Sequence, residues 1–394
     1  MKQRVASLTG LRAVAAAAVC ATHAAFSTGR YTDDFAGHSW ARLEVGVPLF
    51  FALSGYLLFR PWVAVLTSGS DRQPALRRYA WHRFRRVLPA YWLVVTLVYL
   101  IGLVRQESNP SGHGFVGYLR HLPLIQIYEF GYMRVGLTQT WSLCVEVAFY
   151  VVLPLIGWFL TVLVCRYRWR PARLLVALAV LAVVSPAWDA IAPHVPNITA
   201  RMWPPAYLWW FLGGMALTVA EPLVRAWPRW ATPSCLVAAM AAYLAACLAV
   251  AGPPTMIPQN VGQAVLKSAL YVVFAVAVIA PLALPPAAAR RGWYDRLLAS
   301  RPLVWLGGIS YEFFLVHLMV MEILLTNVLH WHVFTGNVVL AFVYTSVVTV
   351  PLAWALRRIT AFGENGPGTP AIRGERREVT HERGAHRRSD SQVV

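Results

Sequence analysis

Long apolar stretches follow one another along most of this chain, and no other feature of the sequence limits its possible folds as strongly. A helix that crosses the hydrocarbon core of a bilayer needs about 20 mostly apolar residues. Ten stretches come close to that requirement, at residues 11–27, 45–66, 88–105, 138–164, 172–188, 203–220, 233–251, 263–285, 303–329 and 335–357. We therefore predict an all-α polytopic membrane protein with about ten transmembrane helices.

The composition agrees with a membrane protein and argues against a soluble or disordered one. Hydrophobic residues make up 58% of the chain and charged residues 13%, about half of the roughly 25% that is usual in soluble domains. A net charge of +18 would suggest nucleic-acid binding in a soluble chain. Here most of the basic residues lie in every second segment between the predicted spans. We therefore expect these charges to face a lipid bilayer, and we expect no nucleic acid as a partner.

The same basic residues predict the orientation of the chain in the membrane. If the N-terminus is cytoplasmic, 28 Arg and Lys residues fall in cytoplasmic segments and six in the segments on the other side. Short cytoplasmic segments of membrane proteins carry such an excess of Arg and Lys. We therefore expect both termini in the cytoplasm and a multi-pass protein of the cell membrane.

The predicted spans form one membrane domain, residues 1–362, because no repeat or linker divides them. Residues 363–394 are polar and rich in Arg, Glu and Gly, which predicts a disordered basic cytoplasmic tail. The N-terminal apolar run is similar to a secretory signal, but we expect it to remain as the first span. The five cysteines form no C-x-x-C pattern, so we expect no metal site and no disulfide framework.

Two ionisable residues within predicted spans are candidate catalytic groups, since such residues are costly in a membrane. Arg12 and His23 are eleven residues apart and so project from one helix face, about 16 Å apart along the axis. Glu146 lies about 12 Å from the outer end of its span by the same rise per residue. A histidine and a carboxylate at matching depth can act as a base and its orienting partner. The alternative is two separately satisfied polar residues that hold helices together.

A polar stripe supports the catalytic interpretation, because Thr138, Ser142, Glu146 and Tyr150 recur at every fourth position. Such a stripe cannot face lipid, so it faces a cavity or a neighbouring helix.

The other ionisable residues within spans are harder to interpret. We expect Lys267 to extend toward the membrane surface and Glu322 to serve helix packing or to line a cavity, and we assign no role to Glu312.

A dense basic segment, residues 77–89, precedes the third predicted span. Its charge is explained by ordinary anchoring at the cytoplasmic surface. A more specific interpretation is that Arg83 and Arg86, one helical turn apart, bind phosphate with their forked guanidinium groups. No Walker or dinucleotide-binding glycine pattern occurs, so the sequence does not support nucleotide hydrolysis or hydride transfer.

At these residues the chain resembles acyltransferase family 3, a family of membrane-bound acyl transferases. The similar segments lie in family order and cover most of the membrane domain: Arg12 followed by His23; Gly46 to Tyr56 with Ser54; Arg83 and Arg86 with Pro89; Trp141 to Tyr150 with Ser142 and Glu146; and Leu306 to His317 with Ser310 and Tyr311. Thr9 stands where the family often has Asp, and Glu312 stands where a small residue is usual. The chain is similar to the stand-alone form, without a C-terminal hydrolase-like domain.

The resemblance implies O-acylation, in which a short acyl group, such as acetyl, moves from acyl-CoA to a hydroxyl. The acceptor it implies contains carbohydrate, as a cell-envelope glycan, a glycolipid or a macrolide-type sugar. It implies catalysis by His23 and Glu146 and donor binding by Arg12, Arg83 and Arg86. We expect further residues to contact substrate, namely Trp141, Ser142, Tyr150, Ser310, Tyr311 and His317. Acyl-CoA is then a substrate, and no permanently bound cofactor is expected.

Several alternatives remain open on the sequence. A membrane transporter or glycolipid exporter would also carry buried ionisable residues, although no inverted repeat is visible, and a non-catalytic scaffold is a third possibility. For an enzyme, His23 acts either as a base or as an acylated intermediate. The acceptor enters from either side of the membrane.

Overall fold

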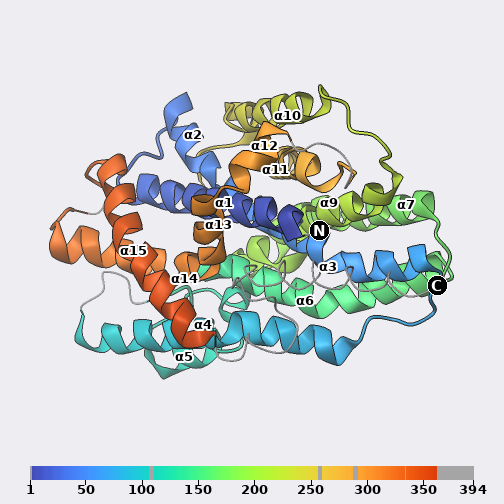
Figure 1. Ribbon diagram of the computed structural model, residues 1–394. Coiled ribbons are helices and arrows are strands. Elements are labelled where there is room, and N and C mark those ends of the chain that lie inside the picture. The colour runs from blue at the N-terminus through green and yellow to red at the C-terminus, as the bar shows by residue number, and fades with distance from the viewer. Residues whose placement is uncertain (1, 106–110, 256–259, 287–291, 333, 362–394) are drawn as a thin grey trace, which may run out of the picture.

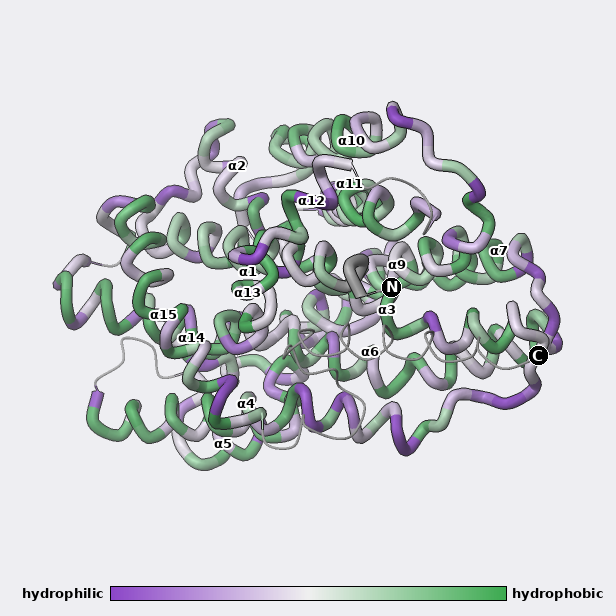
Figure 2. Tube along the Cα trace, in the orientation of Figure 1, coloured by the Kyte–Doolittle hydropathy of each residue, from purple (hydrophilic) through white to green (hydrophobic). Residues whose placement is uncertain are grey.

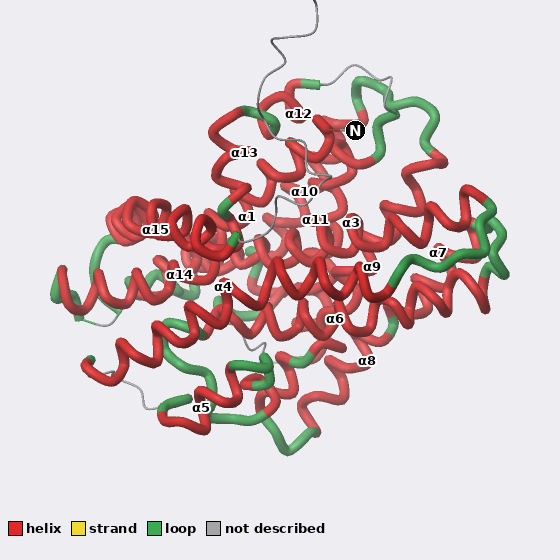
Figure 3. The backbone as a smooth tube through the Cα atoms, turned by 60° about the horizontal axis from the view of Figure 1, so that its bottom comes forward, coloured by secondary structure: helices red, strands yellow, loops and turns green. Residues whose placement is uncertain are grey.

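The computed structural model describes residues 2–105, 111–255, 260–286, 292–332 and 334–361, and the described regular structure is helical throughout (Figure 3). The predicted tail, residues 363–394, lies outside the described residues. Most helices run roughly side by side, with α1 through the middle of the bundle and α4 and α10 on opposite sides (Figure 1). The predicted all-α class is therefore confirmed.

The helices, in chain order, are α1 (Lys2–Ser27), α2 (Phe35–Arg42), α3 (Gly46–Ser68), α4 (Leu76–Val104), α5 (Gly114–His121), α6 (Trp141–Trp158), α7 (Pro171–Ala182), α8 (Val184–Ile191), α9 (Leu208–Ala220), α10 (Ala231–Ala246), α11 (Val261–Ala283), α12 (Trp293–Leu298), α13 (Arg301–Gly308), α14 (Ser310–Ile323) and α15 (Val338–Thr360). Short 3-10 and π-helical turns extend several of them. The π-helical turns follow α6 at Phe159–Val164 and α14 at Leu324–Val328.

Eight helical segments among the described residues are long and apolar enough to cross a membrane, where about ten were predicted. Two of the predicted spans, 203–220 and 233–251, form the shorter helices α9 and α10, of 13 and 16 residues. At 1.5 Å per residue these helices are about 20 and 24 Å long, shorter than a core of about 30 Å. Prolines at both ends of α9, as in Pro204–Tyr207 and Glu221–Leu223, favour 3-10 turns there.

The outer faces of the bundle are apolar, as a surface in contact with lipid requires. The helices are mostly hydrophobic along their length, and hydrophilic stretches occur mainly at their ends and in the connections (Figure 2). Many large aliphatic side chains on α4, α7 and α15 are exposed in the isolated chain, among them Leu97, Leu100, Leu103, Val176, Val180 and Val347.

Small residues let the central helices approach closely, as is usual between helices in membranes. A side chain at Gly46, at the start of α3, would overlap the carbonyl oxygen of Ala15 in α1. A side chain at Gly307 in α13 would overlap the carbonyl oxygen of Thr9. The glycines in the family-like segments therefore have a packing role.

A buried arginine holds the connection between α1 and α3 against the far end of α10. Arg42 is fully buried, and its Nε donates to the carbonyl of Ala246 at 2.8 Å, while Nη2 donates to the carbonyl of Gly252 at 2.6 Å. Loop carbonyls buried in this way need donors, because an unsatisfied buried polar group costs about 1–3 kcal/mol. This clamp positions the next turn, Leu43–Val45, which carries Glu44.

Candidate active site

Three arginines of α1 and α4 lie within electrostatic range of one another. Arg12 comes from α1, and Arg83 and Arg86 come from α4. Arg12 interacts electrostatically with both of the other arginines and with Glu146 of α6. Arg12 and Arg83 are partly buried and Arg86 is exposed. Three positive charges therefore surround one carboxylate at this end of the bundle.

The hydrogen-bond donors of these guanidinium groups remain available for a ligand. Within the described ranges, Arg12, Arg83 and Arg86 make no hydrogen bond or ion pair with another side chain. Arg83 lies over the ring of Tyr150, with its Cζ 5.8 Å from the ring centre. Clustered guanidinium groups of this kind bind phosphate or carboxylate with paired hydrogen bonds, so the cluster is suited to an anionic ligand.

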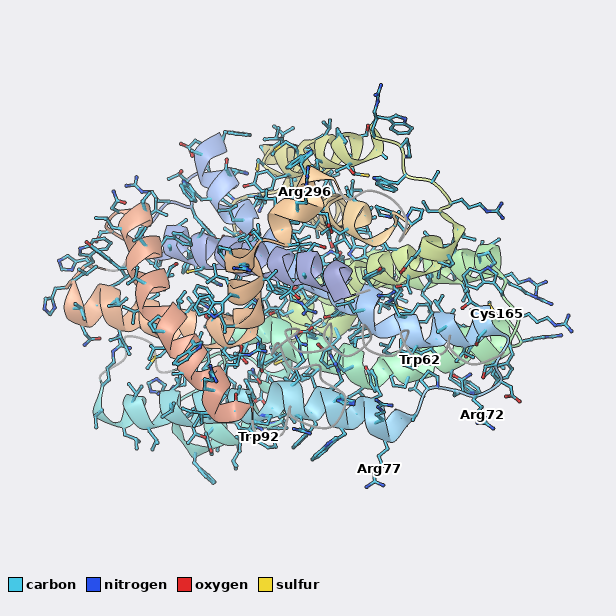
Figure 4. All side chains as sticks on the ribbon, viewed as in Figure 1. Trp62, Arg72, Arg77, Trp92, Cys165 and Arg296 are labelled. Atoms are coloured by element: carbon cyan, nitrogen blue, oxygen red, sulfur yellow. The ribbon has the colours of Figure 1, made fainter. Side chains whose placement is uncertain are left out.

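Arg77, from the same basic segment, behaves differently. It is exposed, and its side chain points away from the bundle in Figure 4. Both interpretations of residues 77–89 therefore have support, since the beginning of the segment projects outward and Arg83 and Arg86 lie beside Arg12.

Glu146 connects α3 to α6 beside this arginine cluster. Its Oε1 accepts hydrogen bonds of 2.6 Å from the hydroxyls of Ser54 and Tyr150. The Tyr150 carbonyl in turn accepts a hydrogen bond of 3.0 Å from Tyr79 of α4. The polar stripe predicted on α6 therefore faces neighbouring helices and the arginines, as expected for a stripe that cannot face lipid.

His23 lies against a second histidine. The ring centres of His23 and His317 of α14 are 5.3 Å apart, and the rings are tilted by 44°. His317 is 1% exposed, and its Nδ1 lies 2.8 Å from the Phe314 carbonyl oxygen. Because a carbonyl only accepts, Nδ1 carries the proton. The buried Nε2 then presents a lone pair, and it has no hydrogen-bond partner among the described residues.

The structure does not bring His23 and Glu146 together at one depth. The depth predicted for Glu146 assumed that its span, residues 138–164, starts at the membrane surface. In the structure the chain before α6 is buried instead. Gln139 and Thr140, in the 3-10 turn that precedes α6, are 2% and 0% exposed. Gln139 donates to the carbonyl of Leu315 at 2.9 Å. Since α6 begins inside the bundle, Glu146 is shifted along the helix to the level of Arg12.

The other residues expected at the site have varied surroundings. Ser142 and Ser310 are buried, and each donates to a backbone carbonyl of the preceding turn, at 3.3 and 2.9 Å. Tyr311 donates to the carbonyl of Val87 in α4 at 2.8 Å. Trp141 lies beside Tyr207, with ring centres 5.0 Å apart, and lines a cavity. Their proposed contacts with substrate stay predictions.

This cavity has a volume of about 500 Å³ and is separate from the arginine cluster. Its walls come from the loop before α3, the segment before α6, α8, the turn before α9, and α11. Aromatic side chains line it together with charged ones, including Glu44, Asp189, Arg201 and Lys267.

Lys267 differs from the expectation that it extends toward the membrane surface. Its Nζ lies 3.2 Å from Glu44 Oε1 in the cavity wall, and only 12% of its side chain is exposed. Glu322 pairs with Arg105 at the end of α4 at 3.1 Å, which agrees with a packing role. Glu44 and Asp189 were not predicted as site residues. Glu44 lies at a predicted span boundary and Asp189 just beyond one, where charged residues are common.

The fold and these groups define a class of protein, a helical protein with several candidate membrane spans and a cluster of arginines beside the helix that carries His23. Residues 5–358 match the family model described as an acyltransferase domain. The chain belongs to acyltransferase family 3.

The chain is similar in sequence to three bacterial proteins. The chain is 25% identical over 338 residues to the peptidoglycan O-acetyltransferase OatA of Listeria monocytogenes, covering 80% of this chain and 49% of OatA. It is 29% identical over 335 residues to the acyltransferase MdmB of Streptomyces mycarofaciens, covering 81% and 79%. It is 25% identical over 350 residues to the putative peptidoglycan O-acetyltransferase YrhL of Bacillus subtilis, covering 84% and 51%.

The chain therefore spans about half of the length of OatA and YrhL and about four fifths of MdmB. No solved structure matches it.

Proposed function

We propose that this protein is an integral-membrane O-acyltransferase of a bacterial plasma membrane. It moves a short acyl group, such as acetyl, from acyl-CoA to a hydroxyl of a carbohydrate-containing acceptor. The observation that carries the proposal is the cluster of Arg12, Arg83 and Arg86, which make no hydrogen bond or ion pair with another described side chain, and of which Arg12 lies on the same helix as His23. Relatives named as O-acetyltransferases and as an acyltransferase support it.

The donor is oriented by its charge. Coenzyme A is a nucleotide with several phosphates, and the guanidinium groups hold these phosphates at the mouth of the bundle. The extended pantetheine arm, about 15–20 Å long by ordinary covalent geometry, carries the thioester inward. Arg12 and His23 are separated by about 16 Å along α1, so the thioester carbonyl reaches the imidazole. If the basic end is cytoplasmic, the donor comes from the cytoplasm, where acyl-CoA is made.

The chemical step needs one base close to the acceptor hydroxyl. A His23 nitrogen takes the hydroxyl proton as the oxygen attacks the thioester carbonyl. The new O–C bond forms, the C–S bond breaks, and the proton on His23 passes to the leaving thiolate. The products are the ester and free coenzyme A, so atoms and charge balance without a cofactor.

In this mechanism His317, rather than Glu146, positions the base. In the structure His317 Nε2 has no hydrogen-bond partner among the described residues and its ring lies against that of His23. The mechanism requires this lone pair to accept the N–H of His23 when the substrates are bound, which leaves the other His23 nitrogen unprotonated and able to act as a base. Glu146 instead balances part of the charge of the arginine cluster and holds Tyr150 and Ser54 in place.

The direct test of the function is acyl transfer by the purified protein in nanodiscs. With radiolabelled acetyl-CoA and envelope glycans or glycosides as acceptors, we expect the label to appear in the carbohydrate. In cells that lack the protein, we expect mass spectrometry to show that the acceptor has lost one acyl increment. Movement of a solute or glycolipid across proteoliposomes without acyl-CoA, with no labelled product, would instead support a transporter and contradict the proposal.

The positioning role of His317 predicts a graded response to substitution. Replacement of His317 by Leu removes the acceptor and should lower kcat roughly 10- to 100-fold, the loss found when a partner that orients a histidine ligand is removed at metal sites. His317→Gln keeps an acceptor oxygen near the position of Nε2 and should retain more activity. The KM for acetyl-CoA should not change, while the pH profile of kcat/KM should shift, because the tautomer of His23 is no longer fixed. Equal activity of His317→Leu and wild type would exclude this role.

A further inference from the structure

The cavity near the start of α6 has rigid aromatic walls. The indole nitrogens of Trp209 and Trp210 donate to the hydroxyl of Ser268 at 2.6 and 2.8 Å, which fixes both rings. Trp210 lines the cavity, and the ring of Tyr207 lies 4.8 Å from it. Flat aromatic faces held in this way provide an apolar surface for a ligand without loss of side-chain entropy on binding.

The polar groups of the cavity are also held in place. Glu44 Oε1 accepts from Tyr271 at 2.9 Å and from Lys267 at 3.2 Å. Asp189, from α8, lines the same cavity and interacts electrostatically with Lys267 and Arg201. Within the described part of the chain it makes no hydrogen bond. A partly buried carboxylate with unused acceptor capacity requires donors, and a ligand with several hydroxyl groups supplies them.

We propose that this cavity binds a pyranose ring of the acceptor, with the apolar face of the sugar on Trp210 and its hydroxyls bonded to Asp189. This inference rests on the proposed function and identifies where its second substrate binds. A cavity of about 500 Å³ lies in the range that encloses a small organic ligand. Carboxylates and basic groups occur together in its mostly apolar walls, which suits a ring with one apolar face and several hydroxyls better than a highly charged anion.

The position of the cavity suits an acceptor. Thr138 lines it, and the next residue, Gln139, donates to the carbonyl of Leu315, two residues before His317. The cavity wall is therefore connected to α14, the helix whose His317 lies against His23.

The two substrates would enter by different routes. Stacked aromatic rings connect the cavity wall to α6, the helix of Glu146: Phe51 and Phe211 have centres 4.4 Å apart, and Phe149 and Phe211 have centres 3.9 Å apart. Phe51 also contacts Tyr207 and Trp210 of the cavity wall, at 6.4 and 5.8 Å. A donor bound by the arginines and an acceptor in the cavity would therefore approach the reaction centre from opposite sides of this layer.

The test measures saturation-transfer NMR of methyl pyranosides, neutral, N-acetylated and amino-substituted, on the full-length protein in nanodiscs. We expect ring protons of at least one glycoside to receive saturation. Asp189→Asn and Trp210→Leu should each weaken its binding about tenfold or more, and should leave acetyl-CoA binding within twofold of wild type. Asp71→Asn is the matched control, because Asp71 is exposed in the loop before α4.

The outcomes separate this inference from the proposed function. If wild type binds and uses acetyl-CoA but Asp189→Asn binds the glycosides as well as wild type, the cavity is not the acceptor site. The same conclusion follows if no glycoside receives saturation, or if decanoate receives it in their place. If wild type neither binds acetyl-CoA nor transfers its acyl group, the proposed function itself fails.

Discussion

Replacement of His23 by alanine is expected to lower acyl transfer about 10²- to 10⁴-fold, the range over which a positioned general base contributes. The effect should fall on kcat, because the imidazole acts on the proton only as the oxygen attacks. The KM for acetyl-CoA should change little, since the donor phosphates are held about 16 Å away along α1. Steady-state rates with acetyl-CoA and a glycoside acceptor measure both parameters.

The control for this prediction is His332→Ala, because His332 is exposed in the loop between α14 and α15 and should leave the rate unchanged. Retained acetyl-CoA binding by His23→Ala shows that the variant is folded. Transfer by folded His23→Ala at nearly the wild-type rate would refute the proposed mechanism. Label that remains covalently attached to wild-type protein but not to His23→Ala would show that the imidazole is acylated before transfer.

Removal of both α4 arginines, in Arg83→Ala/Arg86→Ala, is expected to raise the KM for acetyl-CoA about 100-fold or more. A hydrogen bond to a charged group contributes about 1.5–3 kcal/mol, and each factor of ten corresponds to about 1.4 kcal/mol. The kcat should change much less, because these contacts to the donor are equal in the ground state and the transition state. The wild-type KM for acetyl-CoA should also rise with salt.

S-acetylpantetheine makes this prediction specific, because it carries the thioester without the phosphates. It should be a poor substrate for wild type and equally poor for the double variant. The matched control is Arg77→Ala/Arg78→Ala, two exposed residues in the first turns of the same helix. An equal loss with acetyl-CoA and S-acetylpantetheine would show that Arg83 and Arg86 support the fold rather than the phosphates.

Local patterns in the chain predicted much of the architecture. Apolar runs of about the length of a bilayer gave most spans correctly, because hydrocarbon thickness sets a length that can be counted along the chain. The shared face of Arg12 and His23 and the one-turn spacing of Arg83 and Arg86 follow from helix periodicity alone. The predicted family was confirmed by the match over residues 5–358.

The partners of individual side chains could not be predicted in the same way. Glu146 was expected beside His23, but the buried turn Thr138–Thr140 begins α6 inside the bundle and brings Glu146 to Ser54 and the arginines. No local pattern reports how deep a loop folds before a helix begins. Eight candidate spans are found among the described residues where about ten were predicted, since apolar composition does not show where prolines shorten a helix such as α9.

The sequence by itself determined the membrane class, the approximate positions of the helices and the chemistry available along each face. It could do so because helix rise, helix period and bilayer thickness act within one segment. Only the tertiary structure decided that His317 accompanies His23 and that Glu44 meets Lys267, 223 residues away along the chain. Such pairs depend on which helix faces pack together, and that choice minimises the free energy of the whole bundle rather than of any one segment.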